Sequence, residues 1–265
     1  MIIHYQPVIE IATQRVVRAE VLCRFPDGAV DMQDLKAFIP HAERVGLIRE
    51  LTESVLLLAL SEWKTWGVAP PLSFNVSRLD LEDPAFFERT MDIFKRCGAE
   101  PAAITLELND GIQSIDDGGA FNAMLRLRAA GIRFAVDGFG PTLSTFSYLE
   151  LERVGVHEVK IDVSGAEGKK ERATIASVVD ISNQLHLDVV AKGVETAQRL
   201  ALVSELGCGF AQGYAIAKPM DAESFVAWLA TEEIAAPRSA PVASGAGSEK
   251  SKSFMGGLFG KRSKT

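Results

Sequence analysis

The sequence predicts an α/β fold, a TIM-like closed (β/α) barrel, and three observations support this. Short apolar runs alternate with amphipathic segments along most of the 265 residues. Several amphipathic segments end at a glycine, as helices commonly do. Several apolar runs end on a charged residue, as barrel strands do where they deliver a site. Alternation of this kind over this length favours a closed barrel.

Strands are expected where apolar runs are short and bounded by turn residues. The first two, 2–10 and 15–25, flank a turn near Thr13, and Glu20 and Arg24 have the parity of one strand face. The remaining strands are expected at 72–77, 103–108, 132–137, 157–162, 187–191 and 210–214.

Helices are expected where apolar residues recur at helical spacing and a breaker follows. In 34–46, Leu35, Phe38 and Ile39 form one stripe before Gly46. The full set of predicted helices is 34–46, 50–66, 84–97, 118–130, a short one within 141–152, 170–186, 196–206 and 221–231.

Composition predicts one large domain, a barrel over residues 1–232, because 47% of the chain is hydrophobic. The net charge of −7 argues against binding of a nucleic acid polymer. The three cysteines are scattered, which argues against zinc and favours a reducing compartment. The N-terminus has no signal-like pattern, so we expect a cytoplasmic protein.

The composition changes after the barrel. Residues 233–250 are rich in Ala, Pro, Ser and Gly and are expected to be a flexible linker. Residues 251–265 combine basic residues with apolar ones. Two interpretations of this tail stay open: a peptide that binds a membrane surface weakly or docks on a partner, or a frayed end.

Polar residues at the ends of three predicted strands suggest one shared site. Asp137 ends the run 132–137 and is followed by two glycines that bracket Phe139. Glu107 ends another apolar run, and Lys160 lies two residues before the end of a third. The carboxyl ends of barrel strands meet at one face. Several carboxylates there predict a site for a divalent metal ion and phosphate.

Ordered sequence blocks over about residues 3–230 resemble the EAL-domain proteins, bacterial phosphodiesterases of cyclic di-GMP and their inactive relatives. The resemblance implies a TIM-like barrel of the EAL type and a phosphodiester cleaved by water between two Mg²⁺ or Mn²⁺ ions. The blocks include Tyr5-Gln6-Pro7, Glu20-Val21-Leu22, Asn75-Val76-Ser77, Lys160-Ile161-Asp162, Gly193-Val194-Glu195, Gln212-Gly213-Tyr214 and Lys218-Pro219.

The resemblance also implies roles for individual residues. The ligands of the first metal ion match Glu20, Asn75, Glu107 and Asp137, so a single Mg²⁺ or Mn²⁺ site is implied if one is retained. Lys160, which we interpret as vestigial, and Glu195 match catalytic positions. Residues that hold cyclic di-GMP are expected at Gln6, Leu22, Arg24 and Lys192.

The departures from the family pattern fall on the second metal ion. The second aspartate of the family's Asp-Asp pair is Gly138, and a glutamate of that metal site is Lys192. Asp110 is a shortened second acid, and the loop 139–145, which in the family links the metal site to a dimer contact, is also altered. Because this loop is altered, the resemblance implies a homodimer less strongly than the unaltered family loop would.

Electrostatics decides between the hypotheses. An ammonium about 4 Å from a divalent cation would repel it by roughly 8 kcal/mol at an effective dielectric constant near 20. We therefore expect a degenerate EAL domain, leaning towards no enzymatic activity: a non-catalytic cyclic di-GMP effector or a module for an unknown signalling partner. The alternatives are a slow one-metal phosphodiesterase and a scaffold without nucleotide binding.

Two of the lysines have simpler interpretations as well. Lys160 could pair with Asp162 alone, and Lys192 could be a surface lysine.

Overall fold

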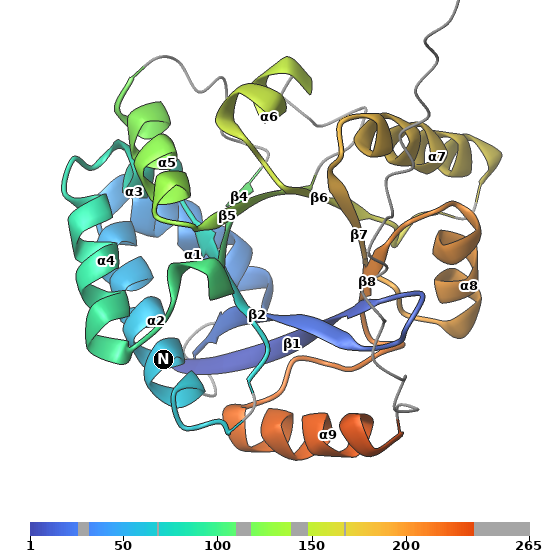
Figure 1. Cartoon of the computed structure of the whole chain (residues 1–265), viewed down its shortest axis with the longest axis horizontal. Coiled ribbons are helices and arrows are strands. Elements are labelled where there is room, and N and C mark those ends of the chain that lie inside the picture. Colours follow the sequence, from blue (N-terminus) through green and yellow to red (C-terminus); the bar gives the residue numbers. More distant parts are fainter. Residues whose placement is uncertain (26–31, 68, 110–117, 139–147, 167, 236–265) are drawn as a thin grey trace, which may run out of the picture.

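The computed structural model is a closed eight-stranded barrel surrounded by helices (Figure 1), which confirms the predicted fold class. The structure describes residues 1–25, 32–67, 69–109, 118–138, 148–166 and 168–235. The strands follow one another around the barrel in chain order, and the last pairs with the first. The carboxyl ends of the parallel strands therefore converge at one mouth.

The strands lie close to their predicted positions. They are β1 (Ile2–Glu10), β2 (Val16–Arg24), β3 (Leu72–Val76), β4 (Ile104–Asn109), β5 (Arg133–Asp137), β6 (Glu158–Asp162), β7 (Asp188–Lys192) and β8 (Phe210–Gln212).

One strand departs from the parallel arrangement. β1 runs antiparallel to both β2 and β8, whereas the pairs from β2 to β8 are parallel. The connection from β1 to β2 is a short turn, and a parallel crossover needs a dozen or more residues. In the resulting register Gln6 lies directly opposite Glu20, so both side chains leave the same face of the hairpin.

The helices also follow the prediction, with two additions: α3 and a 3₁₀ turn at Pro101–Ala103. The hydroxyl of Ser77 accepts a hydrogen bond from the amide of Leu79 and Asp80 caps the amide of Ser77, which starts α3 directly after β3. The helices are α1 (Met32–Val45), α2 (Ile48–Trp63), α3 (Arg78–Glu82), α4 (Phe86–Cys97), α5 (Gly119–Ala129), α6 (Tyr148–Val154), α7 (Lys169–Gln184), α8 (Ala197–Glu205) and α9 (Ala222–Ala235).

The last helix runs to Ala235, beyond the expected domain boundary at 232. Residues 236–265, which include most of the expected linker and the whole tail, lie outside the described residues. Within the described ranges, no helix combines the length and the apolar character needed to cross a bilayer. Cys23, Cys97 and Cys208 are free thiols.

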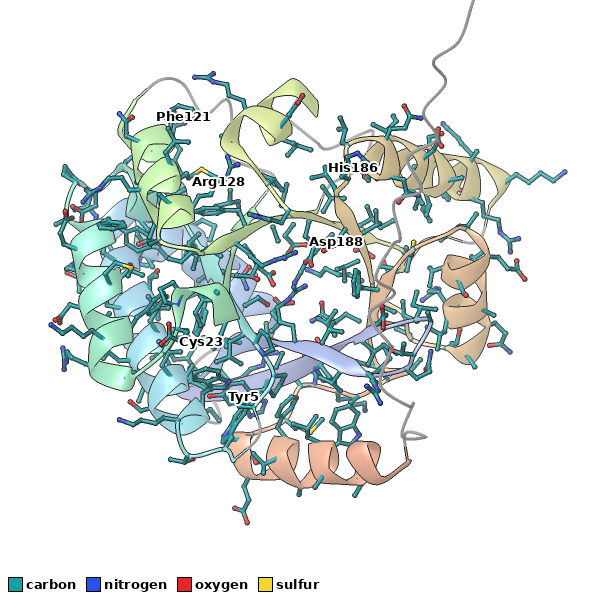
Figure 2. The ribbon with its side chains drawn as sticks, in the orientation of Figure 1. Tyr5, Cys23, Phe121, Arg128, His186 and Asp188 are labelled. Atoms are coloured by element: carbon teal, nitrogen blue, oxygen red, sulfur yellow. The ribbon has the colours of Figure 1, made fainter. Side chains whose placement is uncertain are left out.

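The two faces of the strands differ in chemistry. The outward face carries fully buried apolar side chains such as Leu72, Phe74 and Phe134, which pack in the core. The inside holds charged groups: Figure 2 shows side-chain nitrogen and oxygen atoms meeting within the ring of strands. Arg18 of β2, for example, donates to both carboxylate oxygens of Glu158 of β6 at 2.6 and 2.5 Å, and both residues are buried.

The segment between β8 and α9 folds back along β1. The amide of Tyr5 donates to the carbonyl of Met220 at 2.7 Å, and the amide of Met220 donates to the carbonyl of Tyr5 at 3.1 Å. The ring of Tyr5 packs on Trp66 and Phe225, with centroids 4.7 and 5.9 Å away. α9 thus lies against β1 on the outside of the barrel (Figure 1), and the segment before it is fixed beside the mouth.

Gly213 is the tightest point of this segment, and it supplies a test of the fold. A Cβ there would lie 2.2 Å from the carbonyl oxygen of Val194 and 2.4 Å from its nitrogen. Because both are backbone atoms, Gly213→Ala is expected to destabilise the domain by roughly 2–4 kcal/mol in urea unfolding.

Gly209→Ala is the matched control, since nothing lies within 4 Å of the added Cβ. Equal free energies of unfolding for the two variants would contradict this packing.

Candidate ligand and metal site

Lys160 lies at the centre of the site and is fully buried inside the barrel. Its ammonium donates to Glu20 Oε2 of β2 at 2.9 Å and to Glu107 Oε1 of β4. Three strands therefore bring one cation and two carboxylates together, with Glu20 and Glu107 both buried. The structure pairs Lys160 with these two acids rather than with Asp162, whose carboxylate accepts from the amide of Ser164.

The three charged groups change one another's affinity for protons. Burial alone would raise the pKa of Glu20, but the ammonium groups of Lys160 and Lys192 hold that pKa well below its usual range. Burial, together with the charge of Glu20, raises the pKa of Glu107 to about 7. Burial would lower the pKa of Lys160, yet Glu107 and Glu20 raise it, so the lysine stays charged.

A second lysine occupies the mouth. Lys192 at the end of β7 donates to both carboxylate oxygens of Asp137 at the end of β5, at 2.8 and 2.6 Å. The side chains of Lys192 and Asp137 are only 29% and 16% exposed. Burial opposes a higher pKa for Lys192, but Glu20 and Asp137 outweigh it and raise that pKa. Lys192 is therefore a partly buried, ion-paired residue and not a solvated surface lysine.

Two amide side chains join Glu20 to its surroundings. Gln212 of β8 donates to Glu20 Oε2 at 2.8 Å and to Gln6 Oε1 at 3.3 Å. Asn75 of β3, exposed at the mouth, donates to Glu20 Oε1 at 3.2 Å. Gln212 is a site residue for which no role was predicted, and its place in the block Gln212-Gly213-Tyr214 was the available signal. Gln6 also donates to the carbonyl of Ala217 at 3.1 Å, which ties the site to the segment before α9.

A cavity of about 220 Å³ adjoins this cluster. It lies between β2, β3 and the helices α1 and α2, and Leu22, Arg24 and Asn75 belong to its lining. Most of the other lining side chains are aliphatic, such as Ile48 and Val55. Arg24 donates to the carbonyl of Cys23 at 2.8 Å and is half-buried. The expected ligand-binding residues Leu22 and Arg24 thus flank a small apolar cavity beside a polar site.

Glu195, which we expected to be catalytic, is largely exposed. Its side chain is 56% exposed and pairs with Arg199 at 3.7 Å. Among the described residues, no hydrogen bond or ion pair joins it to Lys160 or the acids around that lysine. Asp110 and the loop 139–145, both singled out in the sequence, lie outside the described residues.

The described residues do not fit a pair of divalent metal ions. Each carboxylate of the expected ligand set already bonds an ammonium group: Glu20 and Glu107 bond Lys160, and Asp137 bonds Lys192. Within the described ranges, no three acidic, histidine or cysteine side chains are grouped so that they could hold a metal ion. Glu107 nevertheless keeps one buried carboxylate oxygen, Oε2, that has no hydrogen-bond partner among the described residues.

Glu107 also makes the stability of the domain depend on pH. Its pKa in the folded state, about 7, lies above the ordinary 4.5, so the folded state binds the proton more tightly. Stability is therefore lost as the pH rises from 4.5 to 7. Relative to Glu107→Gln, which stays neutral, the wild type is expected to lose up to about 3 kcal/mol of unfolding free energy across this window.

Asp80, whose pKa burial raises to about 6, titrates in the same window in both proteins, so the difference between them isolates Glu107. A difference in unfolding free energy that stays constant from pH 4.5 to 7 would contradict the assignment.

The chain is similar in sequence to a known protein family. The family model described as EAL domain matches residues 1–219. A cyclic di-GMP phosphodiesterase of Pseudomonas aeruginosa is 32% identical over 232 residues, which cover 85% of this chain and 39% of that relative's length. The chain thus spans less than half of that curated relative.

Solved structures agree with this match. The PaMucR phosphodiesterase, solved as a complex with cyclic di-GMP, superposes with a TM-score of 0.77 at 27% identity over 84% of this chain and 93% of that chain. The calcium and cyclic di-GMP complex of Klebsiella pneumoniae BlrP1 superposes with a TM-score of 0.70, covering 82% of this chain and 55% of that chain. Its identity of 23% supports the fold alone. Together with the family match over residues 1–219, these findings show that the chain belongs to the EAL-domain family.

Proposed function

We propose that this chain is a degenerate EAL domain that binds cyclic di-GMP without hydrolysing it and passes the signal to a protein partner. The observation that carries the proposal is the bond of Lys192 to both carboxylate oxygens of Asp137, next to Gly138. A second divalent ion at this place would need acids where the chain has an ammonium and a glycine.

The charges inside the barrel also argue against a second divalent ion. Its acids are Glu20, Glu107, Asp137 and Glu158, and its cations are Arg18, Lys160 and Lys192. With four acids and three cations, the interior carries at most one excess negative charge. A further divalent cation would therefore leave the interior positively charged, which burial makes costly.

A phosphodiester anion suits the mouth better than a metal ion does. Lys192 and Arg24 are cations near the carboxyl ends of β7 and β2, and Gln6 adds an amide. Charged donors bind phosphate oxygens strongly, and arginine can do so with two parallel hydrogen bonds. The relatives that are phosphodiesterases or bind cyclic di-GMP make this dinucleotide the ligand we infer.

One observation favours a second function, a slow phosphodiesterase with a single Mg²⁺ or Mn²⁺ ion. The unpartnered Oε2 of Glu107 is an oxygen that could serve as a metal ligand, beside Glu20 and Asn75. We rank this second, because Lys160 and Lys192 bond all three carboxylates of the set.

Nucleotide binding and turnover separate these functions. We expect cyclic di-GMP to bind the purified chain with a dissociation constant on the order of 1 μM in calorimetry. EDTA should leave that constant unchanged, and turnover to the linear dinucleotide in Mn²⁺ should stay far below about 1 s⁻¹. Turnover near that rate would favour the one-metal enzyme, whereas the absence of binding would favour a scaffold.

The lost metal site is tested by restoring its acids. Gly138→Asp combined with Lys192→Glu is expected to raise Mn²⁺ affinity at least about tenfold, because two carboxylates replace a glycine and an ammonium. Gly138 has φ of 74°, a conformation that aspartate tolerates better than most residues.

The control is Gly138→Asn with Lys192→Gln, which matches the double variant in shape but adds no negative charge. If the acidic and the amide pair bind Mn²⁺ equally well, the electrostatic account of the site is wrong.

A further inference from the structure

The charges of this chain are divided unequally between the barrel and the residues that follow it. Residues 1–235, which end with α9, contain 34 acidic and 22 basic residues, a net charge of −12. Residues 236–265 contain one acidic residue and six basic ones, a net charge of +5. An asymmetry of this kind is typical of a segment that binds a nucleic acid or a membrane.

The basic residues of the segment 250–265 are accompanied by large apolar ones, and no acidic residue lies among them. The basic residues are Lys250, Lys252, Lys261, Arg262 and Lys264, and the large apolar ones are Phe254, Met255, Leu258 and Phe259. An anionic lipid bilayer suits both kinds, because its headgroups attract the cations and its acyl chains accept the apolar side chains. A nucleic acid polymer offers the charges but no apolar interior for Met255 and Leu258.

The structure fixes the point from which this segment departs. α9 packs against β1, where the buried ring of Phe225 lies 5.9 Å from that of Tyr5, measured between centroids. α9 begins just after Met220, which bridges Tyr5, and runs along β1 towards the end of that strand (Figure 1). That end, Glu10, pairs with Phe210 at the start of β8, so it lies opposite the mouth. The chain therefore leaves α9 on the side of the barrel away from the ligand and metal site.

The acidic barrel need not touch the surface that the segment binds. Residues 236–249 lie between α9 and the segment, and most of them are Ala, Pro, Ser or Gly. A chain of this length and composition spans about 20 Å. Repulsion between exposed charges is largely screened beyond about 8 Å at physiological ionic strength. The negative charge of the barrel is therefore compatible with a segment that is bound to an anionic surface.

The barrel itself is the other anionic surface within reach, and it suits the segment less well. The large hydrophobic side chains that the described residues expose are spread over several elements. They include Ile2 on β1, Leu58 on α2, Leu125 on α5 and Val226 on α9. The barrel could thus attract the basic side chains but offers the apolar ones only scattered contacts, whereas a bilayer accepts both.

We propose that residues 250–265 bind the surface of an anionic lipid bilayer and tether the barrel to it. The basic side chains bind the headgroups, and the apolar side chains enter the boundary between headgroups and acyl chains. Because the chain departs opposite the mouth, the ligand and metal site stays open to solution. Binding is weak and reversible, and it decreases as salt is added. This inference is independent of the proposed function, since it requires neither nucleotide nor metal ion.

Sedimentation of the full chain with lipid vesicles tests the inference. The wild type is expected to bind vesicles of phosphatidylethanolamine and phosphatidylglycerol and to stay in solution with vesicles of phosphatidylcholine alone. Lys261→Gln, Arg262→Gln and Lys264→Gln together should weaken binding to the anionic vesicles roughly 100-fold, at about fivefold for each basic residue. Phe254→Ser with Phe259→Ser, which keeps every charge, should weaken it at least about tenfold.

The matched control is Lys64→Gln with Lys95→Gln and Lys170→Gln, which removes the same charge from exposed positions of the barrel and should bind as the wild type does. A wild type that stays in solution with the anionic vesicles, as it would if the segment docked on the barrel or on a protein, would overturn the inference. So would an equal loss of binding in the control and the basic triple variant, undiminished binding of the phenylalanine variant, or equal binding to phosphatidylcholine. Thermal unfolding verifies that each variant is folded.

Discussion

The ammonium of Lys160, buried among carboxylates, is the interaction on which this structure depends. A charged group inside a barrel is tolerated only where opposite charges and hydrogen bonds replace water. Glu20 and Glu107 supply the opposite charges, and Gln212 and Asn75 hold Glu20 in place. Because these side chains come from β2, β3, β4, β6 and β8, the closed barrel is what holds them together.

The same requirement explains the rest of the interior. Arg18 and Glu158 form a second buried ion pair inside the barrel, and Lys192 with Asp137 forms a third at the mouth. The barrel is thus filled with ion pairs on its inner face and apolar side chains on its outer face. Buried pairs of this kind add little net stability but are costly to break.

Much of the fold could be predicted because the signals are local. Periodicity and terminal glycines located the long helices and the strands, and strand parity placed Glu20 and Arg24 on one face. The short helix α3 was missed because it depends on a cap between Ser77 and Asp80 rather than on an apolar stripe. The antiparallel course of β1 against β8 depends on how the barrel closes, which no local pattern specifies.

The site was predictable in part for the same reason. Strand ends identified Asp137 and Glu107, and the motifs pointed to Glu20 and Lys192. The partners of these residues come from distant parts of the chain: Gln212 is 192 positions from Glu20. The pair of Arg18 and Glu158, 140 positions apart, carried no sequence signal, because each looks like an ordinary charged residue of a strand.

We propose that the ammonium of Lys192 takes the place of a metal ion beside Asp137. Anomalous scattering from crystals soaked in manganese, without added nucleotide, measures this directly. We predict no manganese pair over Asp137, with the Lys192 ammonium remaining within hydrogen-bond distance of that carboxylate. Two fully occupied manganese ions side by side at Asp137, with Lys192 displaced, would contradict the central claim.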